Sequence, residues 1–247
     1  MVSILRVPRV LDLYAAMRYS IWVRFNASNI DRPLSALAIW RLPNLNHGSF
    51  TIRDDKTMRR VIIAITGASG VIYGIRALEL LRAVEDVETH AIITPSAYRT
   101  ALAEVDYQPE QIRELADHLY NHKDIGAAIS SGSFQTNGML VAPCSIKTLS
   151  AIANCFNEEL TARAADVCLK ERRRVVLMLR ETPFHAGHIK LMDQATHSGA
   201  IIMPPVPGFY ARPKSLDDII NQSVGRALDL LDIELPDVKR WTGSGVK

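Results

Sequence analysis

The chain has 247 residues, of which 48% are hydrophobic and 22% are charged, with a formal net charge of +3 at pH 7. This length can bury a full hydrophobic core, as one large domain or two small ones. The small net charge gives no support for nucleic-acid binding, and no apolar run in the sequence is long enough to span a membrane.

Residues 1–57 differ from the rest of the chain. They hold three prolines, scattered arginines and few acids. We interpret them as a loosely packed arm, or as an extension upstream of a natural start at Met58, with a domain at 58–247. The expected localisation is cytoplasmic. An Arg-rich, acid-poor leader is also typical of a transit peptide, so a mitochondrial location is the alternative.

From Arg59 onward, strand-like and helix-like segments alternate. The predicted strands are 61–66, 88–94, 139–142, 175–179 and 200–203. The predicted helices are 71–84, 96–104, 109–119, a segment carrying Leu149, Ile152 and Ala153, and then 158–171, 186–197 and 215–231. This alternation predicts a single doubly wound, Rossmann-like α/β domain with a parallel sheet.

The first strand runs directly into the turn Gly67-Ala68-Ser69-Gly70, and a helix follows. Glycines let the backbone approach a ligand, and the free amides of a helix start favour an anion, so the turn is a candidate phosphate site. The turn lacks the Gly-Lys-Ser/Thr of a Walker loop. The second strand ends in Thr94-Pro95-Ser96 instead of an acidic residue, which argues against NAD. A plain strand-to-helix turn remains the alternative.

Ligands of such sheets bind at the carboxyl ends of the strands. Those ends carry hydroxyls, helix starts and an arginine, at Thr94, Ser145–Thr148 and Arg180, with Tyr210 after the last strand. This set suits an anionic, polyhydroxylated ligand such as FMN, bound without a metal. These residues could also have purely structural roles. The alternatives are an N-cap pair at Ser145 and Thr148, an ion pair between Arg180 and Glu181, and packing of Tyr210 in a turn.

Other chemistry-bearing residues favour structural roles. The cysteines Cys144, Cys155 and Cys168 lack metal-ligand spacing, so free thiols are expected. His185 and His188 have no third ligand at suitable spacing and are expected to be surface or capping residues. Asp217-Asp218 is typical of the acidic first turn of a capped helix, and Arg172-Arg173-Arg174 of a solvated helix end.

Several motifs together resemble the UbiX family of flavin prenyltransferases, which includes partner subunits of phenolic-acid decarboxylases. They are Gly67-Ala68-Ser69-Gly70, the 130–134 loop, Pro143-Cys144-Ser145-Ile146-Lys147-Thr148-Leu149, Thr161–Val167, Leu169–Arg172, Arg180-Glu181-Thr182-Pro183 and Pro204–Tyr210. The resemblance runs from about Arg59 to Trp241. It implies a flavoprotein-type fold.

The resemblance also implies an activity. Members of the family join a dimethylallyl group, from dimethylallyl monophosphate, to N5 and C6 of reduced FMN without a metal. The prenylated FMN passes to a UbiD-type decarboxylase, and the enzymes are expected to be dodecamers. The segments 185–192 and 239–241 resemble different branches of the family, so the partner decarboxylase stays open.

Site residues follow from the resemblance, position by position. Those matching FMN contacts are Gly67, Ala68, Ser69, Thr94, Ser145, Ile146, Lys147, Thr148 and Arg180. Those matching the prenyl-donor site are Tyr210, Arg226, Lys170 and Trp241. Those expected to take part in catalysis are Ser69, Glu104, Lys170 and Glu181.

Two other functions were weighed. A flavin-dependent decarboxylase of peptidyl or pantothenoyl cysteine should carry an early catalytic histidine and an Asn-Met motif, and neither stands in the expected place. A non-catalytic FMN-binding accessory subunit of an aromatic-acid decarboxylase would not need Lys170, Glu181, Tyr210 and Arg226. The prenyltransferase is therefore the favoured function.

Overall fold

The structure is a computed structural model, and it describes residues 58–243. These residues belong to one structural unit. The expected N-terminal extension, residues 1–57, lies outside the described residues. Within residues 58–243, no helix has the length and apolar character needed to cross a membrane.

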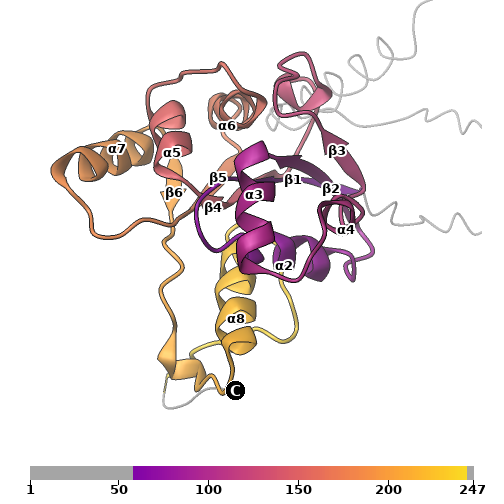
Figure 1. Cartoon of the computed structure of the whole chain (residues 1–247), viewed down its shortest axis with the longest axis vertical. Coiled ribbons are helices and arrows are strands. Elements are labelled where there is room, and N and C mark those ends of the chain that lie inside the picture. Colours follow the sequence, from indigo (N-terminus) through magenta and orange to yellow (C-terminus); the bar gives the residue numbers. More distant parts are fainter. Residues whose placement is uncertain (1–57, 244–247) are drawn as a thin grey trace, which may run out of the picture. The chain divides into compact units, whose positions relative to one another are not determined.

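A six-stranded sheet forms the centre of this unit, with the strand order β3-β2-β1-β4-β5-β6 (Figure 1). Its strands are β1 (Arg59–Ile65), β2 (Val87–Ile93), β3 (His118–Tyr120), β4 (Gly138–Cys144), β5 (Arg174–Leu179) and β6 (Ala200–Ile202). All neighbouring strands are parallel. The chain builds outward from β1 through β2 to β3, and then returns to the other side of β1 for β4. The predicted doubly wound, parallel α/β fold is thus confirmed.

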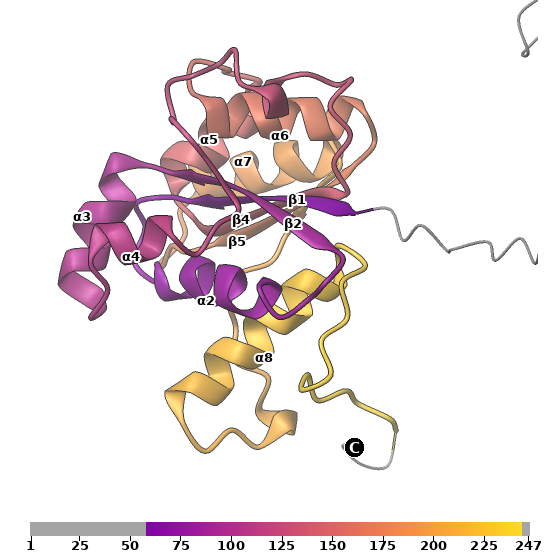
Figure 2. The same ribbon diagram turned by 90° about the vertical axis from the view of Figure 1, so that its right-hand side faces the viewer.

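Helices cover both faces of the sheet (Figure 2). They are α2 (Ile72–Leu81), α3 (Pro95–Glu104), α4 (Pro109–Arg113), α5 (Ile146–Ala153), α6 (Leu160–Lys170), α7 (Ala186–His197) and α8 (Leu216–Asp229), with short 3-10 turns η1 (Ala128–Ser130) and η2 (Phe209–Ala211). Figure 2 shows α2 and α8 on one face and α5, α6 and α7 on the other.

The apolar run of β1 follows from burial on both faces, as expected for a central parallel strand. Ile63 and Ile65 belong to the core cluster beneath α2 and α8, whereas Ile62 and Ala64 belong to the cluster beneath α5 and α6. Helix α2 packs closely against the sheet, because a Cβ at Gly74 would lie 2.2 Å from the carbonyl oxygen of Ala142. Only glycine fits that contact without a shift of the backbone.

The expected helix 109–119 is wrong in its second half. Helix α4 ends at Arg113, and residues 118–120 form the edge strand β3. The cause is a contact distant in sequence. The Asp117 carboxylate accepts hydrogen bonds from the amide and hydroxyl of Thr89 in β2, at 2.8 and 2.7 Å. This contact draws the chain beside β2, where main-chain pairing replaces the helix.

The expected solvated helix end at 172–174 is also wrong in part. Arg172 has a left-handed backbone, with φ of 59°, and ends the helical path. Arg173 donates hydrogen bonds to the carbonyl oxygens of Gly132 and Phe134, at 2.6 and 2.8 Å. Arg174 begins β5 and forms an ion pair with Asp232. Two of the three arginines therefore hold neighbouring segments.

Other structural expectations are confirmed. The Ser215 side chain and the Asp218 carboxylate form a reciprocal capping box at the start of α8. His185 caps α7, since its Nδ1 accepts from the amide of Gly187. All three cysteines are free thiols, and complete burial raises the pKa of Cys144 to about 12.

Candidate active site

A cavity of about 200 Å³ opens at the carboxyl end of the sheet. Strands β1 and β4 adjoin there, at the point where the strand order reverses. This is the position at which doubly wound sheets bind ligands. The cavity is lined by Thr66, Gly67, Thr94, Pro95, Ser96, Arg99, His122, Ser145, Lys147, Thr148 and Glu159.

One buried hydroxyl ties the two central strands together at the floor of the cavity. The Thr66 hydroxyl, at the end of β1, donates to the carbonyl oxygen of Pro143 at 2.7 Å. Its oxygen also accepts from the amide of Ser145 at 2.9 Å. The position of Ser145 is thus fixed by β1 as well as by its own strand.

Two helices begin at the cavity. Thr94 caps α3, with its hydroxyl accepting from the amide of Ala97, and it contacts the Ser96 hydroxyl at 3.0 Å. Ser145 caps α5 through the amide of Thr148. The expected N-cap contact between Ser145 and Thr148 is therefore present. The same hydroxyls line the cavity, so the two helix starts also present an anion site.

The glycine turn approaches the cavity closely. A Cβ at Gly67 would lie 2.3 Å from the Ser96 hydroxyl oxygen, so a larger residue would force Ser96 or the turn to shift. Gly70 has φ of +92°, a conformation that favours glycine. Ala68 is half-buried, and Ser69 is exposed at the top of the turn. The turn therefore lies directly beside the Ser96 hydroxyl that lines the cavity.

Two cations and one carboxylate are among the residues that line the cavity. Arg99 and Lys147 both line it, and Lys147 forms an ion pair with Glu159 at 2.8 Å. Arg99, His122 and Glu159 line the cavity but were not predicted from the sequence. His122 was hidden because it follows β3, the strand that was mistaken for helix. Arg99 stands one helical turn after Ser96, and this spacing is a signal that could have identified it.

Arg180 and Glu104 lie beside the glycine turn, and Glu181 follows Arg180 in the chain. The amide of Arg180 donates to the carbonyl oxygen of Cys144 at 3.0 Å, which places the residue beside the end of β4. The Glu104 carboxylate accepts from the amides of Gly70 and Val71, at 2.7 and 3.3 Å. The Glu181 carboxylate accepts from the amide of Thr182. Within residues 58–243, no ion pair joins Arg180 to Glu181.

The positive charge of Arg180 reaches Tyr73 in α2. Burial raises the pKa of the Tyr73 phenol above its ordinary value, and the charge of Arg180 acts in the opposite direction. The Cγ of Arg180 also lies 3.8 Å from a Cβ built at Gly70. The aliphatic part of the Arg180 side chain thus lies close to the glycine turn.

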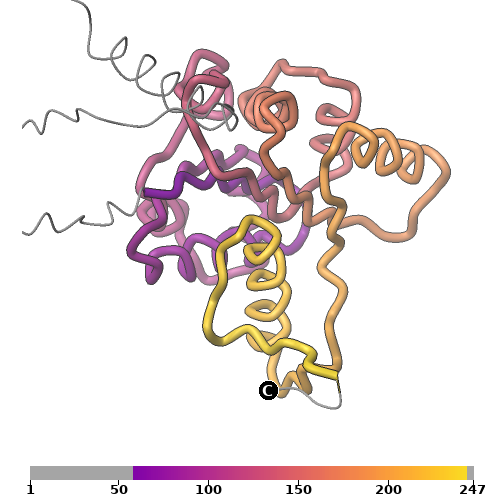
Figure 3. The backbone as a smooth tube through the Cα atoms, turned by 180° about the vertical axis from the view of Figure 1, so that it is seen from behind, coloured from indigo at the N-terminus to yellow at the C-terminus, as the bar shows by residue number. Residues whose placement is uncertain are grey.

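Three of the four expected donor-site residues gather elsewhere. The Tyr210 hydroxyl accepts from Gln222 in α8, and its ring meets that of Trp241 edge-on, with centroids 6.3 Å apart. Arg226 forms an ion pair with Asp229 in the same helix. Figure 3 shows the long connection from β6 to α8 running away from the sheet. None of the three lines the cavity.

Lys170 lies at the amino end of the sheet. It ends α6 only four residues before Arg174, the first residue of β5, and it forms an ion pair with Glu171. Ile146, by contrast, opens α5 beside the cavity and is half-buried against the core. Within one chain, the predicted FMN contacts therefore lie in or near the cavity. Tyr210, Arg226 and Trp241 lie on or near α8, and Lys170 lies at the amino end of the sheet.

Comparisons with known proteins agree with this geometry. The Flavoprotein family profile matches residues 49–227. The flavin prenyltransferase UbiX of Thauera aromatica is 55% identical over 185 residues, which are 75% of this chain and 95% of the relative. UbiX of Escherichia coli K12 is 54% identical over 76% of this chain and all of the relative. The chain belongs to the UbiX family of flavin prenyltransferases. The expected family and the transferase class are thus confirmed.

Solved UbiX structures share the fold. AnUbiX (PadA1), in complex with FMN and dimethylallyl pyrophosphate, is 49% identical with a TM-score of 0.73, over 75% of this chain and 98% of its own. A dodecameric FMN-dependent UbiX-like decarboxylase from Escherichia coli O157:H7 is 41% identical with a TM-score of 0.72, over 74% and 100%. The peptidyl-cysteine decarboxylase EpiD, 16% identical with a TM-score of 0.51, shares the fold alone.

Proposed function

We propose that the chain transfers a dimethylallyl group from dimethylallyl monophosphate to N5 and C6 of reduced FMN, for use by a UbiD-type decarboxylase. The observation that carries this proposal is the cavity at the strand reversal, lined by hydroxyls, helix starts and cations, in a chain of the UbiX family. AnUbiX is named with both FMN and an allylic diphosphate.

The cavity suits the phosphate of FMN. Ser96, Ser145 and Thr148 offer hydroxyls, and the starts of α3 and α5 offer backbone amides. Arg99 and Lys147 supply positive charge without any metal. Gly67 leaves room beside Ser96, where a Cβ would fill the space. The residues present thus fit the group, and we assign Gly67–Ser69, Thr94, Ser145–Thr148 and Arg180 to its binding.

Bound FMN supplies the nucleophilic positions to which the prenyl group is joined. The chain must hold the donor, stabilise the phosphate that leaves and exclude water from the allylic carbon. We assign Lys170, Tyr210 and Arg226 to the donor phosphate and the exposed Trp241 ring to the prenyl group. Glu181 would give a proton to the leaving phosphate, and Glu104 would accept a proton from the flavin. Ser69 is assigned to the same catalytic group.

This assignment requires more than one copy of the chain. Lys170 lies at the amino end of the sheet, and Tyr210, Arg226 and Trp241 lie on or near α8, away from the cavity of the same chain. We infer that neighbouring copies bring these residues to the cavity. A homo-oligomer, of the kind named for the dodecameric relative, would complete the site.

The competing function is a non-catalytic FMN-binding subunit. One observation favours it, since Arg226 and Lys170 are each held by an acidic neighbour within the chain. The deciding experiment is anaerobic. Protein is mixed with FMN, a reductant and dimethylallyl monophosphate, or the diphosphate in parallel, and the extracted flavin is weighed by mass spectrometry. A gain of one five-carbon unit is expected, whereas bound but unmodified FMN with both donors would overturn the transferase.

The proton-acceptor role of Glu104 has a separate test. Glu104→Gln keeps an oxygen for the amides of Gly70 and Val71 but removes the carboxylate. We expect FMN binding to persist while single-turnover prenyl transfer slows by about 100-fold. Glu114→Gln, at an exposed position after α4, is the matched control. Prenyl transfer at the normal rate by Glu104→Gln would rule out the proton-acceptor role. The hydrogen bonds to the amides of Gly70 and Val71 would then be the remaining role of Glu104.

We further propose that residues 58–247 form the prenyltransferase domain, that residues 1–57 are an extension to it, and that the protein acts in the cytoplasm. The relatives named above align with about three-quarters of the chain. A yeast relative, 48% identical, is named as mitochondrial. Fluorescence microscopy of the full chain and of residues 58–247, each fused to a fluorescent protein, would distinguish the two locations.

A further inference from the structure

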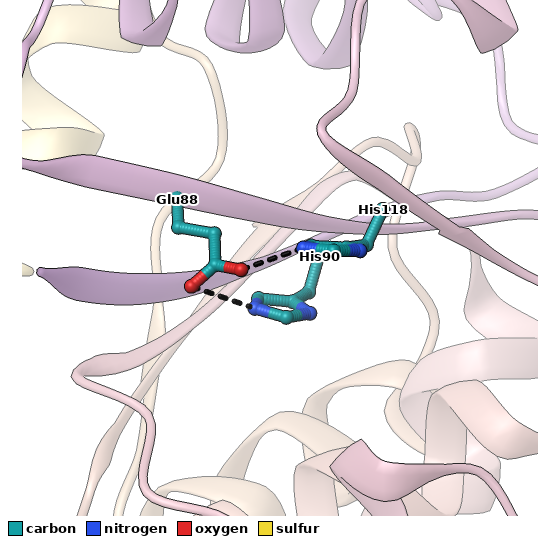
Figure 4. Close-up of side chains that lie close together, drawn as sticks. All are labelled: Glu88, His90 and His118. Atoms are coloured by element: carbon teal, nitrogen blue, oxygen red, sulfur yellow. Dashed lines mark hydrogen bonds and ion pairs between the residues drawn. The ribbon is translucent and has the colours of Figure 1, made fainter.

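Three potential metal ligands meet on β2 and β3, at a distance from the cavity along the strands. Glu88 and His90 lie in the amino half of β2, and His118 begins β3 (Figure 4). His90 and His118 are direct neighbours in the pairing of the two strands. One ligand atom from each of the three side chains lies within 4.8 Å of the others. Among residues 58–243, this is the only such group of three.

His90 is a buried imidazole with a free ring nitrogen. Its side chain is 3% exposed, and its Nε2 has no hydrogen-bond partner. Its Nδ1 lies 3.0 Å from the Tyr120 hydroxyl. If Nδ1 carries the hydrogen and donates it to Tyr120, Nε2 presents a lone pair toward Glu88, as a metal ligand does.

Glu88 supplies an oxygen on the same side. Its Oε1 lies 2.6 Å from Nε2 of His118, and its Oε2 lies 3.9 Å from Nε2 of His90. Arg60 donates its Nε hydrogen to Oε2 at 3.0 Å. Oε1 is therefore open to a cation once the His118 side chain moves.

We propose that His90 Nε2, His118 Nε2 and Glu88 Oε1 bind a divalent transition-metal ion of the Zn²⁺ class, with water as a fourth ligand. Two imidazoles and one carboxylate are a common ligand set for an open zinc site. Tyr120 orients His90, and Arg60 orients Glu88 through its other oxygen, as outer partners do in metal sites.

The arrangement requires one adjustment. The rings of His90 and His118 are nearly parallel, at 14°, with centroids 4.8 Å apart, so their nitrogens do not yet converge. The His118 side chain is half exposed and on an edge strand, so it can rotate, whereas His90 is held by Tyr120 and by an edge-on contact with Phe134. The bound ion would crosslink β3 to β2 through ligands from both strands. This role is independent of the chemistry in the cavity.

The test uses the full-length protein, first stripped with a chelator and then titrated with Zn²⁺ in competition with a colorimetric chelator. One ion per chain is expected. Replacement of the ion by Co²⁺ should give the intense visible absorption of a four-coordinate site. His118→Ala is expected to weaken Zn²⁺ binding by about 100-fold, and Tyr120→Phe by about 10- to 100-fold, as for an outer partner.

His185→Ala removes an exposed histidine outside the group and serves as the matched control, with Zn²⁺ binding expected to be unchanged. Unaltered circular dichroism and FMN binding in His118→Ala would confirm that the variant folds. The proposal is overturned if the wild type shows no saturable Zn²⁺ binding, or if His118→Ala binds Zn²⁺ as the wild type does.

Discussion

At the scale of single residues, the Thr66 hydroxyl joins the two central strands at the floor of the cavity. It is buried, it donates to Pro143 and it accepts from the amide of Ser145. These two partners lie on β4 and at the start of α5, 77 and 79 positions further along the chain. One side chain therefore sets the spacing between the two halves of the cavity.

Thr66→Val removes that hydroxyl and keeps the shape of the side chain. The carbonyl of Pro143 and the amide of Ser145 would each lose a hydrogen-bond partner. We therefore expect the free energy of unfolding to fall by about 1–3 kcal/mol. FMN binding should weaken by about tenfold as Ser145 shifts. Urea denaturation and fluorescence titration with FMN measure the two effects. Thr196→Val, at an exposed position in α7, is the control and should change neither.

The contact between Gly67 and Ser96 makes a second prediction. Gly67→Ala places a methyl group 2.3 Å from the Ser96 hydroxyl oxygen and 2.4 Å from its Cβ. Overpacking of this kind costs about 1–3 kcal/mol, so FMN binding should weaken by about tenfold or more. The double variant Gly67→Ala/Ser96→Gly should regain part of the loss. Equal losses in the single and double variants would show that the contact is not the cause.

At the scale of elements, the sequence predicted what local pattern determines. The long apolar strands, the capped start of α8 and the hydroxyls at two helix starts were all visible as residue types in order. β3 was not, because three residues with mostly exposed side chains carry no strand periodicity. Its position depends on the contact between Asp117 and Thr89. Missing β3 also concealed His122 at the cavity.

The Asp117 carboxylate should make β3 sensitive to acid. Burial would raise its pKa, but hydrogen bonds from Thr89 outweigh this and hold the folded-state pKa below the ordinary value. Its stabilising effect is thus present above the unfolded pKa, about 3.9, and is lost as the pH falls through the lower folded value. Asp117→Asn should lower the urea midpoint at pH 7, and the difference from wild type should shrink below about pH 4.

Hydrogen exchange would locate the effect of Asp117→Asn. Faster exchange is expected for amides of β3, with β1 and β4 unaffected. Glu114→Gln provides a nearby exposed control. An unchanged midpoint at pH 7 would show that another contact holds β3 beside β2.

At the scale of the whole molecule, the second half of the described chain exposes large apolar side chains. Val206, Phe209, Leu216 and Trp241 are between 63% and 75% exposed. Val206 and Phe209 lie on the connection from β6 to α8, Leu216 begins α8, and Trp241 contacts Tyr210. Exposed apolar groups gathered in this way are typical of a protein interface. They are the surface on which the inferred assembly would depend.

Phe209→Asp should therefore break the assembly. We expect light scattering to show smaller species and prenyl transfer to fall by about 100-fold or more, because donor-side residues would no longer be positioned. FMN binding should fall much less, since its cavity lies within one chain. Ile125→Asp changes an exposed residue in the loop after β3 and should leave assembly and transfer intact. A fully active, smaller Phe209→Asp species would contradict the shared-site assignment.

The pairing of β1 with β4 has a consequence for synthesis on the ribosome. β1 leaves the exit tunnel early, but the strand that covers its second edge follows only about 77 residues later. At about 5–20 residues per second, that edge waits for about 4–15 s. During this interval β1, whose last five residues are buried in the folded sheet, has unpaired backbone groups along one side. The nascent chain is then most open to pairing with another copy, and a chaperone holding residues 59–65 would protect it best.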